Sequence, residues 1–263
     1  MFHLNVLWII ILIIKLFGFI YFIYLKYYNA TISIDYYVIT MKSNDRLENI
    51  EKQLAKINNT SSKIDIQHVD TVVGVNLNLK TLIDNYTLSP IFYDDSKHRK
   101  GEIGCAMSHL KVYNMIASKL KNSKVNNRSK YSVVFEDDFE ILTPDFIQIV
   151  NSSIRIAEKE GFDMLLLGTN PRVYENGKHP RNKGVHIKGD VYHFNPTMLY
   201  YRAHAILINN TSIFKIIDEL KYITEPFDQK IQVCAINGKF KILTLYPCIV
   251  EVVPEIKSII RDN

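Results

Sequence analysis

Hydrophobic and polar positions along this chain form three kinds of pattern. The run from Val6 to Leu25 is apolar throughout except for Lys15. Beyond it, short apolar runs rich in β-branched residues alternate with stretches whose apolar residues recur every three or four positions. The short runs predict buried strands and the recurrence predicts amphipathic helices. Their alternation predicts an α/β domain, in which helices flank a sheet.

The predicted elements can be placed by residue number. Strands are expected over residues 36–40, 64–73, 131–135, 163–167, 205–208 and 241–245. Helices are expected over residues 44–57, 104–120, 212–220 and 227–236, with another beginning after Thr143-Pro144-Asp145. Residues 76–100 and 171–195 are expected to be largely irregular. No repeat or low-complexity linker interrupts residues 29–263, which predicts a single domain there.

The apolar run predicts a membrane anchor, because at 1.5 Å per residue it spans the ~30 Å hydrocarbon core. A cleaved signal peptide fits less well, since only His3 precedes the run and the best small residue after it, Ala30, lies behind Tyr28. A buried helix of a soluble domain needs fewer residues that are apolar on every side. We therefore expect an uncleaved, single-pass anchor over residues 1–28.

The orientation of this anchor depends on weaker signals. Flanking charge is slight on both sides of the apolar run. Sequons of the form N-x-Ser/Thr are frequent and favour a type II orientation with a lumenal or extracellular domain, although a bacterial source would weaken this inference. These sequons begin at Asn29, Asn58, Asn59, Asn85, Asn127, Asn151, Asn209 and Asn210.

Composition narrows the functional classes only slightly. The 16 Tyr and 13 Phe, with 22% charged residues, exclude a disordered chain. A net charge of +5 neither demands nor excludes a nucleic-acid partner. The three cysteines are an odd number and predict no disulfide framework, and no C-x-x-C or Cys/His pair supports a zinc site.

The most informative motif is a run of three carboxylates, Glu136-Asp137-Asp138, directly after the apolar run YSVVF. Carboxylates at the end of a buried strand are electrostatically costly unless a cation neutralises them. Hard oxygen ligands favour Mg²⁺ or Mn²⁺, and the carboxyl end of a strand is where open α/β sheets bind ligands. An acidic turn open to solvent is the alternative. The apolar run before the carboxylates favours the metal site.

A second motif, GEIGC-x-x-SH, covers residues 101–109. Its two glycines, Gly101 and Gly104, are expected at a helix start, where close backbone approach and exposed N–H groups suit anions. Ser108 and His109 follow in the next turns. Taken alone, this segment is equally compatible with a helix cap beside an incidental histidine.

These motifs, with YVITMKSNDR (residues 37–46) before them, resemble glycosyltransferase family 25. GEIGC-x-x-SH matches at every fixed position, and Glu136-Asp137-Asp138 corresponds to the family's acidic hallmark. Weaker similarities follow, and their ranges are 70–74, 204–217, 226–228 and 247–259. The resemblance covers about residues 36–259. Ala205-Ile206 departs from the aromatic residue that the family often has, so acceptor specificity is not carried over.

The resemblance implies a GT-A-type nucleotide-diphospho-sugar transferase fold, with a mixed, mostly parallel sheet. It implies a hexose, with galactose or glucose favoured, transferred from a UDP-sugar to a hydroxyl of a glycan, lipid-linked or protein acceptor, with inversion. Mn²⁺, or else Mg²⁺, is expected on Glu136, Asp137 and Asp138, with His204 or His193 as a further ligand. Asp228 is the expected base, although a carboxylate that favours a helix N-terminus explains it equally well. The residues expected to bind the donor are Thr40, Arg46, Gly101, Glu102, Gly104, Ser108 and His109.

Two other functions remain open at this stage. A metal-dependent phosphohydrolase or nuclease could use the same carboxylates, with Asp94, Asp95 and His98 as its additional cluster. A catalytically inactive relative could serve as an anchored binding module. We expect no nucleic-acid partner for the transferase.

Overall fold

The computed structural model describes residues 12–19, 21, 32–58, 64–92, 96–124, 128–171, 184–195, 200–254 and 256. The chain divides into two compact units, Met1–Ile32 and Ser33–Asn263. In the first unit, residues 12–19 are helical. Within the described residues, no helix combines the length and the apolar character needed to cross a bilayer. The predicted anchor therefore gains no support here, and most of residues 1–28 lie outside the described part.

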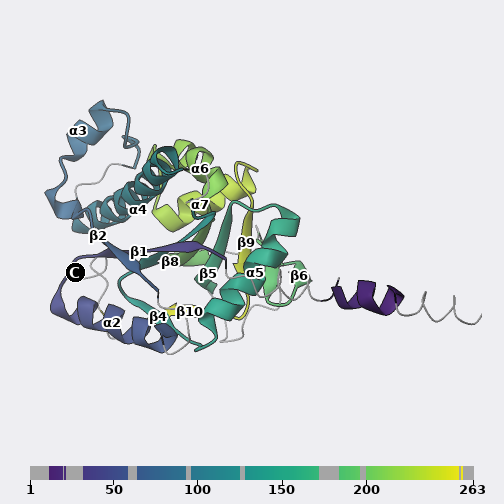
Figure 1. Ribbon diagram of the computed structural model, residues 1–263. Coiled ribbons are helices and arrows are strands. Elements are labelled where there is room, and N and C mark those ends of the chain that lie inside the picture. Colours follow the sequence, from purple (N-terminus) through teal and green to yellow (C-terminus); the bar gives the residue numbers. More distant parts are fainter. Residues whose placement is uncertain are drawn as a thin grey trace, which may run out of the picture. The chain divides into compact units, whose positions relative to one another are not determined.

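The second unit is built on a mixed sheet, which has eight strands within the described residues (Figure 1). The strands lie in the order β2-β1-β3-β8-β5-β9-β7-β6. Their bounds are β1 Ile34–Thr40, β2 Ile66–Asp70, β3 Tyr131–Glu136, β5 Met164–Pro171, β6 His186–Lys188, β7 Val191–His193, β8 Tyr200–Asn209 and β9 Ile242–Leu245. A second, two-stranded sheet pairs β4 Phe139–Ile141 with β10 Val250–Val252.

The direction of the strands corrects the expectation of a mostly parallel sheet. Among the described strands of the large sheet, the parallel pairs are β1–β2, β1–β3 and β5–β9. The antiparallel pairs are β3–β8, β5–β8, β7–β9 and β6–β7. Strand β8 interrupts the parallel pairing at the centre of the sheet, because it lies antiparallel between β3 and β5. The fold is therefore α/β with a mixed sheet, and parallel pairing does not predominate.

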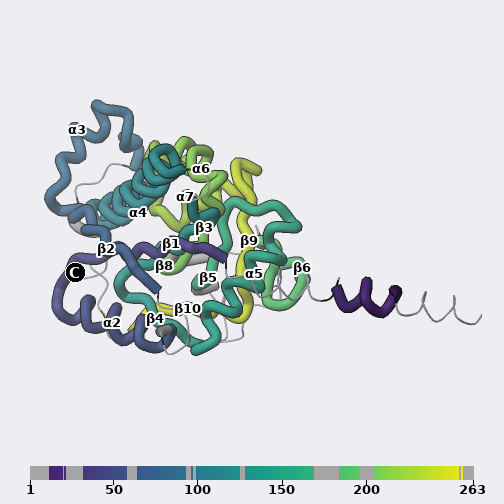
Figure 2. The backbone as a smooth tube through the Cα atoms, viewed as in Figure 1, coloured from purple at the N-terminus to yellow at the C-terminus, as the bar shows by residue number. Residues whose placement is uncertain are grey.

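Helices cover both faces of the sheet, as Figure 1 shows. Helices α4, α6 and α7 lie on one face, and α2 and α5 lie on the other. Helices α4 and α7 are far apart in the chain but lie side by side, which the tube in Figure 2 makes easy to follow. The helix bounds are α2 Asn44–Asn58, α3 Leu79–Asp84, α4 Lys97–Asn122, α5 Phe146–Glu160, α6 Ile213–Leu220 and α7 Phe227–Ile236.

The structure contains several elements that the sequence pattern did not predict. Helix α3 and the first turns of α4 lie in the segment expected to be irregular, and β6 and β7 lie in the second such segment. Strands β4 and β10 are three residues each, too short for a periodicity to be recognised. Helix α4 begins at Lys97 rather than Gly104, because Ser96 caps it by accepting a hydrogen bond from Arg99 N at 3.2 Å.

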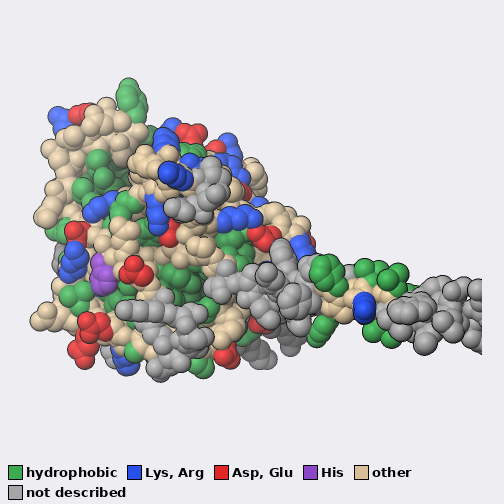
Figure 3. Space-filling view, in the orientation of Figure 1, with side chains coloured by type: hydrophobic (Ala, Val, Ile, Leu, Met, Phe, Trp, Pro, Cys, Tyr) green, Lys and Arg blue, Asp and Glu red, His purple; other side chains and the backbone are tan. Residues whose placement is uncertain are grey.

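The sheet places three loops at one edge. Strands β1, β2 and β3 are parallel neighbours, so the residues that follow Thr40, Asp70 and Glu136 emerge together. Strand β3 is held rigidly, since Tyr131 through Phe135 are buried on both faces. On the face shown in Figure 3, basic and acidic side chains are interspersed over the described surface. The local chemistry of this edge therefore says more about function than the overall charge.

Candidate active site

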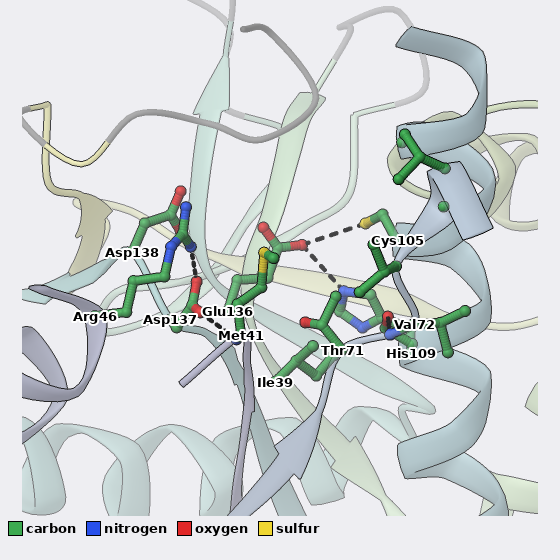
Figure 4. Close-up of a pocket in the computed structure, with 15 residues that line it drawn as sticks. Ile39, Met41, Arg46, Thr71, Val72, Cys105, His109, Glu136, Asp137 and Asp138 are labelled. Atoms are coloured by element: carbon green, nitrogen blue, oxygen red, sulfur yellow. Dashed lines mark hydrogen bonds and ion pairs between the residues drawn. The ribbon is translucent and has the colours of Figure 1, made fainter. Parts of the chain in front are cut away.

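A cavity of about 270 Å³ lies at the edge where β1, β2 and β3 end (Figure 4). One side is formed by α4 and the loop after β2, which pack against each other, and Arg46 lies on the other side. The floor carries the carboxylates that follow β3. The lining residues are Ile39, Met41, Arg46, Thr71, Val72, Val73, Gly74, Val75, Gly101, Cys105, Ser108, His109, Glu136, Asp137 and Asp138. A mainly apolar wall with a few convergent charged groups is typical of a small-molecule site.

Asp137 is bound by the protein itself. Its carboxylate pairs with the guanidinium of Arg46 and accepts a hydrogen bond from Met41 N at 3.0 Å. Both side chains of the pair are buried, with 8% of Arg46 and 6% of Asp137 exposed. Burial raises the pKa of Asp137, and the charge of Arg46 opposes that rise. Asp137 therefore fixes the acidic turn to β1 and α2, and its oxygens are occupied in the described structure.

Helix α2 holds the same turn through two buried amides. Asn49 Nδ2 donates to the backbone oxygens of Asp137 at 3.1 Å and of Phe139 at 3.0 Å. Gln53 Nε2 donates to Asn49 Oδ1 at 3.1 Å, and Gln53 Oε1 accepts from Ile141 N at 3.0 Å. With Arg46 these side chains form a polar stripe on one face of α2. The stripe fixes the backbone that carries the carboxylates.

Glu136 points away from Arg46 and toward α4, as Figure 4 shows. Its Oε1 lies 3.0 Å from His109 Nε2 and 3.7 Å from Cys105 Sγ. Burial opposes ionisation of Glu136, but the hydrogen bond and charge of His109, with a further contribution from His204, lower its pKa. Glu136 is thus an ionised carboxylate held by α4 at the floor of the cavity.

Asp138 is the carboxylate that the protein leaves unsatisfied. Its Oδ1 is buried and has no hydrogen-bond partner among the described residues. Burial raises the pKa of Asp138 to about 7, and the charges of Glu136 and Asp137 add to the rise. A buried oxygen without a partner, beside an ionised carboxylate, is what a hard divalent cation would satisfy. The residues present therefore fit Mn²⁺ or Mg²⁺, with Glu136 and Asp138 rather than Asp137 as the ligands.

The two histidines proposed as further metal ligands lie in different places. His204 is buried on β8, and its Nε2 donates to Val250 O at 3.2 Å, because a carbonyl oxygen can only accept. Its charge acts on Glu136, which places it near the acidic turn. His193 Nε2 instead lies 3.8 Å from Glu160 Oε2, and His193 does not line the cavity.

The GEIGC-x-x-SH motif lies inside α4 and fastens that helix to the loop after β2. Ser108 Oγ accepts from Val72 N at 2.8 Å and donates to Gly104 O at 2.7 Å. A Cβ on Gly104 would lie 2.6 Å from Val72 O, and one on Gly74 would lie 1.8 Å from Lys100 O. These glycines therefore permit close contact between helix and loop. The expectation that Gly101 and Gly104 open the helix is wrong, because α4 begins four residues before Gly101.

The residues expected to bind the donor divide into two groups. Arg46, Gly101, Ser108 and His109 line the cavity. The other three are placed elsewhere or engaged by the protein. Thr40 is fully buried and its Oγ1 accepts from Lys42 N at 2.9 Å, Glu102 pairs with Arg99, and Gly104 packs against Val72 and Gly74.

Asp228 lies in the first turn of α7 and is not among the residues that line the cavity. Its charge is one of the causes that raise the pKa of the Cys105 thiol, after burial and the charge of Glu136. The preceding residue, Phe227, stacks on the His109 ring with centroids 3.9 Å apart. Asp228 Oδ1 also accepts from Gln229 N at 2.8 Å, as expected for a carboxylate at a helix N-terminus.

Sequence reasoning missed three contributors to the site. Asn49 and Gln53 have the spacing of an ordinary solvated helix face, yet 7% and 1% of these residues are exposed. Cys105 lies within the GEIGC-x-x-SH motif, but the functional prediction for this motif rested on its glycines, Ser108 and His109 and not on the thiol. The spacing of Cys105 and His109, four residues apart on a predicted helix, was the signal available. Asp94 and Asp95 of the alternative hydrolase cluster lie outside the described residues, as does the side chain of His98.

A mixed α/β fold that gathers carboxylates and a cavity at the carboxyl ends of parallel strands defines an enzyme that binds its ligand at that edge. The sequence profile of glycosyltransferase family 25 (LPS biosynthesis protein) matches residues 33–230, and the chain belongs to this family. The protein is therefore a glycosyltransferase. A comparison with curated proteins finds no significant match.

Proposed function

We propose that this glycosyltransferase moves a hexose, with galactose or glucose favoured, from a UDP-sugar to a hydroxyl group of a glycan, lipid-linked or protein acceptor. We further propose that the reaction depends on Mn²⁺ or Mg²⁺ and inverts the anomeric centre. The observation that carries this proposal is the buried, unpartnered Oδ1 of Asp138 in a cavity that Glu136 also lines. Family membership supports the sugar donor and the acceptor as general classes.

Glu136 and Asp138 would hold the cation, and the chain around them keeps these two carboxylates in place. A bound Mn²⁺ or Mg²⁺ supplies Lewis-acid stabilisation of the charge that develops on the leaving diphosphate. Arg46 lines the same cavity, and its charge balances Asp137 so that the turn does not repel an anionic donor. The wall formed by Val72, Val73 and Val75 offers an apolar surface to the nucleoside end of the donor.

Asp228 is proposed as the general base. The acceptor hydroxyl gives its proton to the Asp228 carboxylate while its oxygen bonds to the anomeric carbon, and the bond from that carbon to the diphosphate oxygen breaks. The charge of Asp228 acts on the Cys105 thiol, which lines the cavity, and this supports the role. The hydrogen bond from Gln229 N in the first turn of α7 supports the alternative, in which Asp228 only stabilises the helix.

Membrane attachment through residues 1–28 remains part of the proposal. The apolar run from Val6 to Leu25 with its single charge supports it. One sequon that favours a lumenal domain is weakened, because Asn210 is only 2% exposed and its Nδ2 donates to Ser129 O at 2.9 Å. The proposed type II orientation therefore depends on the remaining sequons. Recovery of the full chain in the soluble fraction without detergent would contradict the anchor.

The decisive experiment is a donor screen of the full chain in detergent with UDP-hexoses and Mn²⁺. We expect UDP release that EDTA abolishes and that Asp138→Asn reduces at least ~100-fold. The matched control is Glu140→Gln, which alters a neighbouring carboxylate that lies outside the cavity and pairs with Lys56 at 3.3 Å. Metal-independent turnover, or full activity of Asp138→Asn, would contradict the metal assignment. Binding of nucleotide without turnover of any UDP-sugar would favour the inactive binding module.

A further inference from the structure

Helix α4 and strand β3 bring a thiol, an imidazole and a carboxylate together at the cavity. Cys105 and His109 lie four residues apart, so they project from the same face of α4. Glu136 meets them from the end of β3, as Figure 4 shows. His109 Nε2 lies 3.0 Å from Glu136 Oε1, Cys105 Sγ lies 3.7 Å from it, and all three ligand atoms lie within 4.8 Å of one another.

The two separations that involve Glu136 Oε1 are close to those of a tetrahedral metal site. Zinc bonds of about 2.0 Å to nitrogen and oxygen and about 2.3 Å to sulfur imply ligand separations of roughly 3.3 Å for N···O and roughly 3.6 Å for S···O. The measured values differ from these by only a few tenths of an ångström. An isolated His–Glu pair would explain the first distance but would not require a thiol on the same oxygen.

The three groups are also held in place and accessible from the cavity. The His109 side chain is fully buried, and its ring stacks on Phe227 at 3.9 Å with an interplanar angle of 15°. Cys105, His109 and Glu136 all line the cavity, and 29% of the Glu136 side chain is exposed, so an ion can reach the three groups from the Glu136 side. Three protein ligands with an open fourth position form a recognised type of zinc coordination.

We propose that Cys105, His109 and Glu136 form a second metal site, selective for thiophilic divalent cations such as Zn²⁺ and Cd²⁺. A thiolate and an imidazole favour these ions over Mn²⁺ and Mg²⁺, for which the Asp138 carboxylate is the better ligand. On binding, the bond from Cys105 Sγ to the metal replaces the S–H bond, and the proton leaves to solvent. The thiolate and the carboxylate together neutralise the 2+ charge, and His109 ligates as the neutral ring.

Glu136 belongs to both proposed sites, which has a consequence for activity. A thiophilic ion on Cys105 and His109 takes a carboxylate from the hard-cation site, so Zn²⁺ or Cd²⁺ inhibits transfer supported by Mn²⁺. This consequence rests on the proposed function. The existence of the second site does not, because it can be measured with metal alone.

The test uses the full chain, reduced and stripped of metal, titrated with Cd²⁺ in the absence of nucleotide. We expect an ultraviolet thiolate-to-cadmium charge-transfer band that saturates at one ion per chain, with release of the thiol proton. Cys105→Ser removes the band, and His109→Gln weakens Cd²⁺ binding at least tenfold. The matched control, Cys248→Ser, alters a half-buried thiol outside the cavity and retains the band.

Absence of the band in the unsubstituted protein, or its persistence in Cys105→Ser, overturns the proposal. Unchanged Cd²⁺ affinity in His109→Gln overturns the proposal as well. If Cys105→Ser does not fold, as shown by the loss of its circular dichroism spectrum, His109→Gln provides the test instead. A band that appears in a protein unable to turn over any UDP-sugar would refute the proposed function while leaving this site intact. Turnover with no band would do the reverse.

Discussion

Two aspartates at opposite ends of the strands lie in very different environments in this fold. Asp163 lies just before β5, and Asp138 lies just after β3, a strand that runs in the same direction as β5. Asp163 pairs with Lys215 Nζ at 2.6 Å, accepts from Ser212 Oγ, and accepts from Lys241 N at 2.7 Å. Asp138 has a buried oxygen for which the described protein provides no partner.

The pKa values of the two groups move in opposite directions. Burial opposes ionisation of Asp163, but its hydrogen bonds to Lys215, Ser212 and the Lys241 backbone lower its pKa. Burial raises the pKa of Asp138 to about 7, and its acidic neighbours add to the rise. The first carboxylate stabilises the fold by itself. The second destabilises the fold when it ionises. A buried carboxylate of this kind is typical of a site where a ligand supplies the missing positive charge.

The largest effect expected from this comparison is on activity. Asp138→Asn should lower the rate of transfer by about 10³-fold, close to 4 kcal/mol, because the proposed metal site would lose one of its two carboxylates. Asp163→Asn should leave the rate of the folded protein unchanged and lower the free energy of unfolding by about 1–3 kcal/mol through its lost hydrogen bonds. UDP-release kinetics and urea unfolding measure the two quantities. Equal losses of activity in both variants would remove the distinction.

The next effect concerns the carboxylate between them, Asp137, which the protein satisfies with Arg46. Arg46→Leu should lower the free energy of unfolding by about 3 kcal/mol, because it leaves a buried charge without its partner. Adding Asp137→Asn to that variant should restore much of the loss, since the unpaired charge is gone. Lys56→Met, which breaks the half-exposed pair with Glu140, serves as the control and should cost less than ~1 kcal/mol. A cost this small for Arg46→Leu would show that the pair does not fix the turn.

The pH dependence of stability should separate the two aspartates directly. The pKa of Asp138 in the folded protein is about 7, above its ordinary value of 3.8. Its contribution to the free energy of unfolding is therefore complete below pH 3.8 and is lost as the pH rises from there through 7. Asp163 has a lowered folded pKa, so its contribution is present above 3.8 and is lost as pH falls further. The free energy of unfolding, measured by urea titration in EDTA, should therefore fall by at most about 1.4 kcal/mol per pH unit between about pH 4 and 7. This fall is due to the proton on Asp138.

Asp138→Asn should remove that slope, and Asp163→Asn should leave it in place. Saturating Mn²⁺ should flatten the slope in the unsubstituted protein, because a bound cation favours the ionised carboxylate. An identical slope in Asp138→Asn would assign the titration to another group.

The smallest expected effect is on stability, and it tests how much the stabilisation provided by Asp163 depends on one partner, Lys215. Lys215 is 48% exposed, so Lys215→Met should lower the free energy of unfolding by less than ~1 kcal/mol. Ser212 and the Lys241 backbone still satisfy Asp163 in that variant. Thermal unfolding of the variant beside the unsubstituted protein measures this. A loss as large as that of Arg46→Leu would mean that both aspartates depend on one cation alone.

The sequence by itself determined the α/β class, most of the longer helices and strands, and the place of the carboxylates at the end of a buried strand. These features follow from local periodicity, because residues 131–135 are apolar throughout and α2 and α7 carry clear boundary signals. Its two motifs also indicated glycosyltransferase family 25, and the profile match confirms the family.

Only the tertiary structure decided which carboxylate does what. Three consecutive acids are alike in sequence, but Arg46 comes from 91 residues earlier to occupy Asp137, and His109 comes from α4 to hold Glu136. The same long-range packing left Asp138 unsatisfied, brought Cys105 to the carboxylate, and turned Ser108 and Gly104 into contacts between helix and loop. Such pairings depend on how elements meet in space, and the period of a single strand or helix carries no information about its neighbour.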